Sequence, residues 1–323
     1  MTLNTIIESL LRKRSKKIVK VLALGGGGAR GLAHIGVIKV LEENGWYPDL
    51  VTGTSMGSIV GALYALHGNA KDLEIKAYEY MQSDWFKRLD IKNVVKTNGD
   101  DYNIDLFDTY IKYMVHKWLD KKEKHPLSLL PANYLLDVMV KIFSDATFAD
   151  LKIPFIAMVS DLYSGGNIEL DSGSLSVAVT ASSSIPGIFS PVEFNNMLLV
   201  DGCVTRNIPI PDSEENKRRE IIAVDVDPSL EMKNKYALTC PFDVILRVNA
   251  VTRIQLNRFY LKQANILISP DVQSIQWSDF NNIEKLIKAG ELATVHHFSN
   301  GSAVENKKPI KVRIPRQVGI NHA

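Results

Sequence analysis

Cysteine is scarce in this sequence, and long hydrophobic runs are absent. Cys203 and Cys240 are the only cysteines in 323 residues, which excludes a disulfide-stabilised scaffold and is typical of a reducing compartment. No stretch approaches the roughly 20 consecutive apolar residues that a membrane-spanning helix needs. A secretory signal places basic residues before its apolar run, whereas here the apolar residues come first. We therefore expect a cytoplasmic protein without a signal peptide or a transmembrane segment.

A strong net charge is absent as well. The net charge is +2 and 46% of the residues are hydrophobic, which excludes a chain that is disordered throughout and predicts a soluble globular protein. Residues 1–20 contain six Lys or Arg against one Glu, and residues 301–323 contain five against one, so the two ends carry about +9 and the remainder about −7. A nucleic-acid-binding protein concentrates basic residues on its folded body. We therefore expect no nucleic-acid partner.

Residues 1–17 are a basic amphipathic segment, and residues 301–323 are a basic tail. In the first segment, apolar residues recur at the spacing of one helix face, and the basic cluster follows them. These apolar residues are Leu3, Ile6, Ile7, Leu10 and Leu11. Two interpretations remain open: a helix docked on the protein's own body, or a peripheral contact with a membrane surface.

Strand and helix patterns alternate in the remaining sequence. Residues 18–25 predict a buried strand, residues 30–43 and 58–66 have helical spacing, and a second short strand is expected at 50–52. This order predicts right-handed βαβ crossovers, and hence an α/β fold with a mainly parallel sheet. Residues 70–150 show helical periodicity with many aromatics and predict a helical insertion. Further elements are expected later: strands at 155–160, 167–170, 197–200, 220–226 and 265–269, and long helices at 243–262 and 283–298.

A glycine-rich loop joins the first predicted strand to the first predicted helix. After Gly25 it comprises Gly26, Gly27, Gly28, Ala29, Arg30 and Gly31. At a helix N-terminus the backbone amides of such a loop form an anion site, which serves a dinucleotide, a phosphate or an oxyanion. A dinucleotide-binding fold has an acidic residue at the end of its second strand, and a phosphate-binding loop has the sequence Gly-Lys-Ser/Thr. This chain has neither feature. The oxyanion hole is the use that remains.

The second predicted strand runs into the motif G-x-S-x-G, formed by Gly53, Ser55 and Gly57. In a nucleophile elbow a sharp strand-to-helix turn exposes the serine hydroxyl, and the flanking glycines relieve crowding around the strained serine. The predicted strand and helix lie on the correct sides of the motif, and the glycine-rich loop precedes it by one βα unit. We therefore interpret Ser55 as a nucleophile rather than as part of a structural turn.

A nucleophilic serine needs a base, and the sequence offers two kinds of candidate. A histidine-dependent enzyme would require one of His34, His296 and His297. The other candidate is Asp201, which lies at the exposed end of an apolar strand and is followed by Gly202 and Cys203. An aspartate before glycine is also common in ordinary turns.

Four stretches of the sequence together resemble the patatin-like phospholipases, a family that uses a Ser–Asp dyad without a histidine. They are GGGGARGLAHIGVIKVLEENG, GTSMGSIVGALYA, ASSSIPGIFSPV and LLVDG, and the resemblance covers roughly residues 18–300. It implies a three-layer α/β/α fold in which the 70–150 insertion is a lid. It also implies that Gly26–Gly31 are the family's glycine loop, Ser55 its nucleophile and Asp201 the second member of the dyad. The family usually continues Asp-Gly with Gly or Ala, where this chain has Cys203.

The resemblance further implies an activity, that of a lipid acyl hydrolase of the phospholipase A or lysophospholipase type. Ser55 would attack an ester of a phospholipid or lysophospholipid to form an acyl-enzyme, and Asp201 would take its proton. The amides of Gly27 and Gly28, with Ala29, would bind the oxyanion, and Arg30 would shape the loop.

No cluster of His, Cys, Asp and Glu has the spacing of metal ligands, so we expect neither a metal nor another cofactor. Two other functional classes remain open. One is a histidine-dependent acyltransferase, and the other is a non-catalytic lipid- or anion-binding module that uses the glycine loop.

Overall fold

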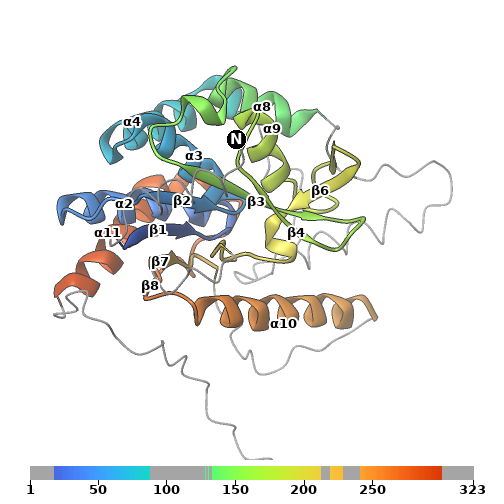
Figure 1. The fold of residues 1–323 in the computed structure, drawn as a ribbon. Coiled ribbons are helices and arrows are strands. Elements are labelled where there is room, and N and C mark those ends of the chain that lie inside the picture. Colours follow the sequence, from blue (N-terminus) through green and yellow to red (C-terminus); the bar gives the residue numbers. More distant parts are fainter. Residues whose placement is uncertain are drawn as a thin grey trace, which may run out of the picture.

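A computed structural model describes most of the chain between the two basic ends (Figure 1). The predicted segment 1–17, the tail 301–323 and most of the 70–150 insertion lie outside the described residues. The described residues are 18–87, 128, 130, 133–211, 219–227 and 241–299, without the side chains of 241–243, 245 and 246.

One mixed sheet forms the centre of the molecule, with the strand order β5-β6-β3-β2-β1-β7-β8, and β4 pairs with β3. Its parallel part consists of β1 (Val19–Leu24), β2 (Leu50–Gly53), β3 (Phe155–Asp161), β7 (Arg219–Val224) and β8 (Ile266–Ile268). Its antiparallel part consists of β4 (Asn167–Leu170), β5 (Val192–Phe194) and β6 (Met197–Asp201), which extend from β3. The predicted mainly parallel sheet is confirmed.

The helices fall close to the predicted ranges, with one shift. The first helix, α2, begins at Ala33 rather than Arg30, because Gly28–Leu32 form the 3-10 turn η1. The described α-helices are α2 (Ala33–Glu43), α3 (Met56–His67), α4 (Ala70–Gln82), α5 (Asp84–Lys87), α8 (Tyr134–Phe143), α9 (Leu175–Ser182), α10 (Pro241–Leu261) and α11 (Ile283–Ser299). Short 3-10 turns also occur at η2 (Phe148–Asp150), η3 (Gly202–Val204) and η5 (Phe280–Asn282). None of the helices in the described ranges is long and apolar enough to cross a lipid bilayer.

The two faces of β1 belong to two different hydrophobic clusters, because successive side chains of a strand point to opposite sides of the sheet. Leu22 and Leu24 lie in the larger cluster, which includes residues of α2, α3 and α11. Val21 and Ala23 lie in the second cluster, which includes Leu261 at the end of α10. Helices therefore cover both faces of the sheet, as the three-layer fold requires.

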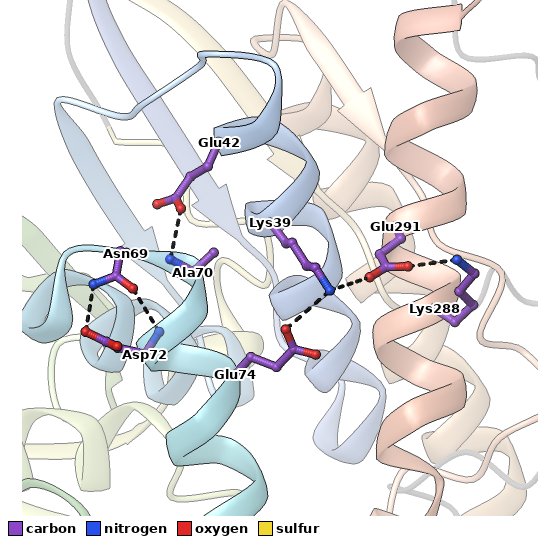
Figure 2. A network of polar contacts seen from close by, with 8 residues as sticks. All are labelled: Lys39, Glu42, Asn69, Ala70, Asp72, Glu74, Lys288 and Glu291. Atoms are coloured by element: carbon purple, nitrogen blue, oxygen red, sulfur yellow. Dashed lines mark hydrogen bonds and ion pairs between the residues drawn. The ribbon is translucent and has the colours of Figure 1, made fainter.

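Helices α2, α4 and α11 are packed closely and joined by ion pairs (Figure 2). A Cβ atom added to Gly36 of α2 would lie 1.9 Å from the carbonyl oxygen of Ile287, so a glycine is needed for this helix contact. Lys39 of α2 lies 3.3 Å from the carboxylate of Glu74 on α4 and 3.0 Å from that of Glu291 on α11. The helix α4 is the first part of the predicted insertion, and it packs into the main core.

Candidate active site

Ser55 lies in the turn between β2 and α3, where the backbone takes an unusual conformation. Its φ and ψ are 54° and −125°, a region that non-glycine residues rarely adopt. Both flanking glycines are sterically required: a Cβ atom on Gly53 would lie 2.4 Å from the carbonyl oxygen of Gly57, and one on Gly57 would lie 2.1 Å from that of Leu24. The turn thus has the strain and the close packing expected of a nucleophile elbow.

The glycine-rich loop lies directly against this turn. A Cβ atom added to Gly26 would be 3.0 Å from the Cβ atom of Ser55, and one added to Gly31 would be 2.4 Å from Cγ of Met56. Gly28 has a φ of 57° and faces the carbonyl of Trp277, so this position also favours glycine. The fold therefore brings the two motifs into contact.

Two amides of the loop are engaged within the protein. Gly26 N–H donates to the carbonyl oxygen of Asn207 at 3.3 Å, and Ala29 N–H donates to that of Trp277 at 2.6 Å. The Ala29 amide is therefore not available as the third oxyanion donor that the sequence suggested. The amides of Gly27 and Gly28, at the N-terminal end of η1, are the candidate donors that remain.

Three side chains fix the loop from different directions. Arg30 Nε donates to the carbonyl oxygen of Ile275 at 2.7 Å, and Asn207 Nδ2 donates to that of Gly26 at 3.4 Å. The imidazole Nε2 of His34 lies 2.8 Å from the carbonyl oxygen of Gly25, which can only accept a hydrogen bond, so Nε2 carries the proton. Nothing in the sequence singles out Asn207, which directly follows two other polar residues, Thr205 and Arg206.

His34 is fully buried, and its environment keeps the ring neutral. Burial lowers the pKa of His34 to about 4, and the hydrogen bond to Gly25 only partly opposes this shift. A base with this pKa and with Nε2 already bonded to the loop is better suited to positioning than to proton transfer. The other two candidate bases, His296 and His297, lie in the last turn of α11.

Asp201 is the last residue of β6 and is fully buried. Its Oδ1 accepts a hydrogen bond of 2.8 Å from the backbone N–H of Cys203, which caps η3. Its Oδ2 has no hydrogen-bond partner within the described residues. Gly202 is sterically required here, since a Cβ atom would lie 2.4 Å from the carbonyl oxygen of Met158. One carboxylate oxygen is thus fixed, and the other is available.

Burial raises the pKa of Asp201 to about 6. Hydrogen bonding from the Cys203 backbone and the approach of the Ser55 hydroxyl lower the pKa, but the desolvation of the charged form outweighs them. The Ser55 hydroxyl is therefore close enough to the carboxylate to lower its pKa, although Oδ2 has no hydrogen-bond partner within the described residues. Catalytic hydrogen bonds in unliganded enzymes are often long and tighten only when substrate binds.

A run of buried serines at the end of α9 connects the two residues. The backbone N–H of Ser55 donates to two oxygen atoms of Ser182, the carbonyl oxygen at 3.0 Å and the hydroxyl oxygen at 3.1 Å. The backbone N–H of Asp201 donates to the carbonyl oxygen of Ser184 at 3.0 Å. This segment, which belongs to the stretch ASSSIPGIFSPV, sets the spacing between Ser55 and Asp201; the sequence alone gave it no such role.

An acidic pair follows β7 on the other side of the glycine loop. A Cβ atom on Gly27 would lie 2.8 Å from the side chain of Val226, so the segment with Asp225 and Asp227 packs on the loop. Burial, and then the charge of Asp227, raise the pKa of Asp225 to about 7. Arg253 of α10 lies 3.5 Å from the Asp227 carboxylate. Across the described part of the chain, no group of three or more His, Cys, Asp or Glu side chains could hold a metal ion.

Known families, curated proteins and solved structures each give matches to this chain. The family model described as patatin-like phospholipase matches residues 22–212, more than half of the chain. An uncharacterised NTE family protein of Mycobacterium tuberculosis is 29% identical over 295 residues, which cover 84% of this chain and 45% of that protein. The lysophospholipase NTE1 of Candida albicans is 26% identical, covering 83% of this chain and 19% of its own length. The chain therefore spans less than half the length of these curated relatives. Among solved structures, VipD from Legionella pneumophila aligns with a TM-score of 0.41 and 14% identity, covering 85% of this chain and 67% of that chain.

Proposed function

Because the chain belongs to the patatin-like phospholipase family, we propose that it hydrolyses a carboxylic ester of a phospholipid or lysophospholipid through a Ser55–Asp201 dyad. One observation carries this proposal. Ser55 in its strained turn and the buried Asp201 are both bonded to the segment Ser182–Ser184, and the glycine loop lies against Ser55. This arrangement supports the proposal that a nucleophile, a base and oxyanion donors act at one point.

In the proposed reaction, Asp201 accepts the proton of Ser55 as Oγ attacks the ester carbonyl. An aspartate has an ordinary pKa of about 3.9 and is a weak base, so the rise to about 6 improves the proton transfer near neutral pH. The amides of Gly27 and Gly28 stabilise the oxyanion that develops. The protonated Asp201 gives this proton to the alcohol part of the lipid as it leaves, and the regenerated Asp201 carboxylate then activates the water that hydrolyses the acyl-enzyme.

Cys203 occupies the position where the family usually has Gly or Ala, and its side chain is compatible with the proposed reaction. Burial, and then the charge of Asp201, raise the pKa of the Cys203 thiol well above its ordinary value. The thiol therefore stays protonated and adds no second negative charge beside the base. Its backbone N–H, which any residue at this position would supply, orients Asp201 Oδ1.

Covalent labelling tests the nucleophile. A fluorophosphonate should modify Ser55 in the full chain, because the reagent phosphonylates an activated serine hydroxyl. The Ser55→Ala variant should show neither labelling nor release of fatty acid from lysophosphatidylcholine, and Ser172→Ala, at an exposed serine, is the control. Labelling of a different serine in an active preparation would contradict the proposal.

A further inference from the structure

The helix α10 presents a row of apolar side chains to solvent. Val244, Val248, Val251 and Phe259 are 46%, 58%, 43% and 60% exposed. Their spacing of four, three and eight residues places them on one face of the helix. The opposite face carries the buried residues Ala250, Asn257 and Leu261, which attach α10 to the body. We call these four exposed residues the apolar stripe.

Basic residues outnumber acidic ones along this helix, whose single acidic residue is Asp243. From Val244 to Lys262 the sequence contains Arg247, Arg253, Arg258 and Lys262 and no Asp or Glu. Arg258 and Lys262 lie on or beside the stripe by helical spacing. An exposed apolar face bordered by Arg and Lys is the pattern of helices that lie in a membrane interface. This charge is complementary to an anionic lipid surface rather than to a neutral one.

The same helix contacts the candidate site from its other side. Arg253 pairs with Asp227, and the segment that contains Asp227 packs on the glycine loop. The positive charge of Arg253 lowers the pKa of Asp201. Near the end of α10, the ring of Tyr260 lies 4.5 Å from the guanidinium of Arg206, five residues after Asp201. Figure 1 shows α10 running along one edge of the molecule. A surface that binds the exposed face of α10 would therefore lie across this helix from the site.

We propose that the apolar stripe of α10 and its basic border dock the protein on an anionic lipid bilayer. The proposal deepens the proposed function and rests on it, because a lipid hydrolase must reach substrate molecules that are held in a bilayer. A lipid surface accounts for both features of the helix: the apolar side chains enter the interface, and Arg258 and Lys262 meet the anionic head groups.

Vesicle co-sedimentation of the full chain tests the surface without depending on catalysis. We expect Ser55→Ala to bind vesicles of phosphatidylcholine with phosphatidylglycerol as well as the native chain does. The double variant Val248→Ser, Phe259→Ser should bind about tenfold more weakly or worse, because two exposed apolar groups no longer enter the interface. The matched control is Leu292→Ser, Val295→Ser on α11, where the exposed fractions are 59% and 47%; it should bind normally.

A second variant separates charge from apolar contact. Arg258→Gln, Lys262→Gln should weaken binding to anionic vesicles several-fold but leave binding to pure phosphatidylcholine unchanged. Thermal unfolding and turnover of a soluble short-chain ester, measured on every variant, show whether each one is folded and chemically intact. Loss of ester turnover in the native chain would refute the proposed function while leaving the docking measurement valid.

Three results would overturn the docking proposal. One is equal binding by the stripe variant, the α11 control and the native chain. Another is a lower molar mass of the stripe variant than of the native chain in light scattering. This result would mean that the stripe forms a contact between two copies of the chain. The third concerns hydrogen exchange of α10 measured without vesicles. If α10 is protected in the native chain and this protection is lost in Ile6→Asp, Ile7→Asp, the stripe is a docking site for the N-terminal segment.

Discussion

At the scale of single residues, the environment of Asp201 predicts how the rate should depend on pH. The carboxylate must be ionised to accept a proton, and its pKa is about 6, so the rate should rise as pH increases through this value and level off above it. Asp201→Asn keeps the shape but removes the basicity. We expect it to lower kcat by on the order of 100-fold or more and to abolish this rise. Stopped-flow or steady-state hydrolysis of a soluble ester between pH 5 and 9 measures both effects.

The same variant has a built-in folding control, because the buried charge is unfavourable for stability. The pKa of Asp201 in the folded chain, about 6, exceeds the ordinary value of about 3.9, so the stability that the group contributes is present below pH 4 and is lost as pH rises through 6. Asn carries no charge. At pH 8 the variant should therefore unfold with a free energy higher by about 3 kcal/mol, since a shift of one pKa unit corresponds to about 1.4 kcal/mol. A folded Asp201→Asn protein with near-normal turnover would contradict the dyad.

His34 is predicted to position the loop rather than to act as the base, and two substitutions separate these roles. Gln can still donate a hydrogen bond to the Gly25 carbonyl but cannot act as a base, whereas Ala can do neither. We expect His34→Gln to keep kcat within about threefold and His34→Ala to lose on the order of 10-fold, because a displaced loop misaligns the oxyanion donors. An inactive but folded His34→Gln would instead favour the histidine-dependent acyltransferase.

The residues that could be predicted from the sequence are those within short motifs. Gly53, Ser55 and Gly57 are read from one five-residue pattern, and Asp201 is read from its place at the end of an apolar strand. Asn207 and Ser182 act through contacts with residues more than 100 positions away in the chain, at Gly26 and Ser55. Periodicity and local motifs carry no information about such pairings.

At the scale of elements, the elbow predicts that Gly57 tolerates no side chain. A Cβ atom there would lie 2.1 Å from the carbonyl oxygen of Leu24 and 2.7 Å from that of Gly25, so β1, the glycine loop and α3 would all have to move. Gly57→Ala should lower the free energy of unfolding by about 3 kcal/mol or more. Urea denaturation measures this loss.

The control for this substitution is Gly45→Ala. Gly45 has a φ of 72°, but an added Cβ atom would have no neighbour within 4 Å. Only the backbone conformation then becomes less favourable, and the loss should be about 1–2 kcal/mol. Equal losses for the two variants would mean that the close contact of the elbow with β1 does not contribute to stability.

Elements with a strong pattern of their own could be predicted, and elements that depend on tertiary contacts could not. The runs that form β1 and α3 have clear strand and helix spacing, and they occur where expected. The three-residue β5 is too short to show an alternating pattern of its own, and it pairs with β6 across the turn Asn195-Asn196, where both residues have positive φ. The early start expected for α2 is wrong because the Ala29 amide bonds to Trp277, which holds Gly28–Leu32 in a 3-10 turn.

At the scale of the whole molecule, the proposed ester hydrolysis takes place at a buried site, whereas the proposed lipid contact is made by exposed segments. The proposed dyad and the glycine loop are held by hydrogen bonds to buried segments, and Asp201 is fully buried. Basic charge is instead concentrated at the two ends of the sequence and along α10, while the remaining residues are net negative. Added salt screens exposed charges far more than buried ones. It should therefore slow hydrolysis of lipids in anionic vesicles much more than hydrolysis of a soluble ester.

This separation leads to a test of the N-terminal basic cluster in the full chain. Its five residues are Arg12, Lys13, Arg14, Lys16 and Lys17. Each basic residue near an anionic surface contributes about 1 kcal/mol, so replacing all five with Gln should reduce hydrolysis of lipids in anionic vesicles by about tenfold or more and flatten its salt dependence. Turnover of a soluble short-chain ester should stay within twofold, because the variant leaves the proposed dyad untouched. If ester turnover and the free energy of unfolding fall together while vesicle binding persists, the segment docks on the protein's own body, and membrane attachment is left to α10 alone.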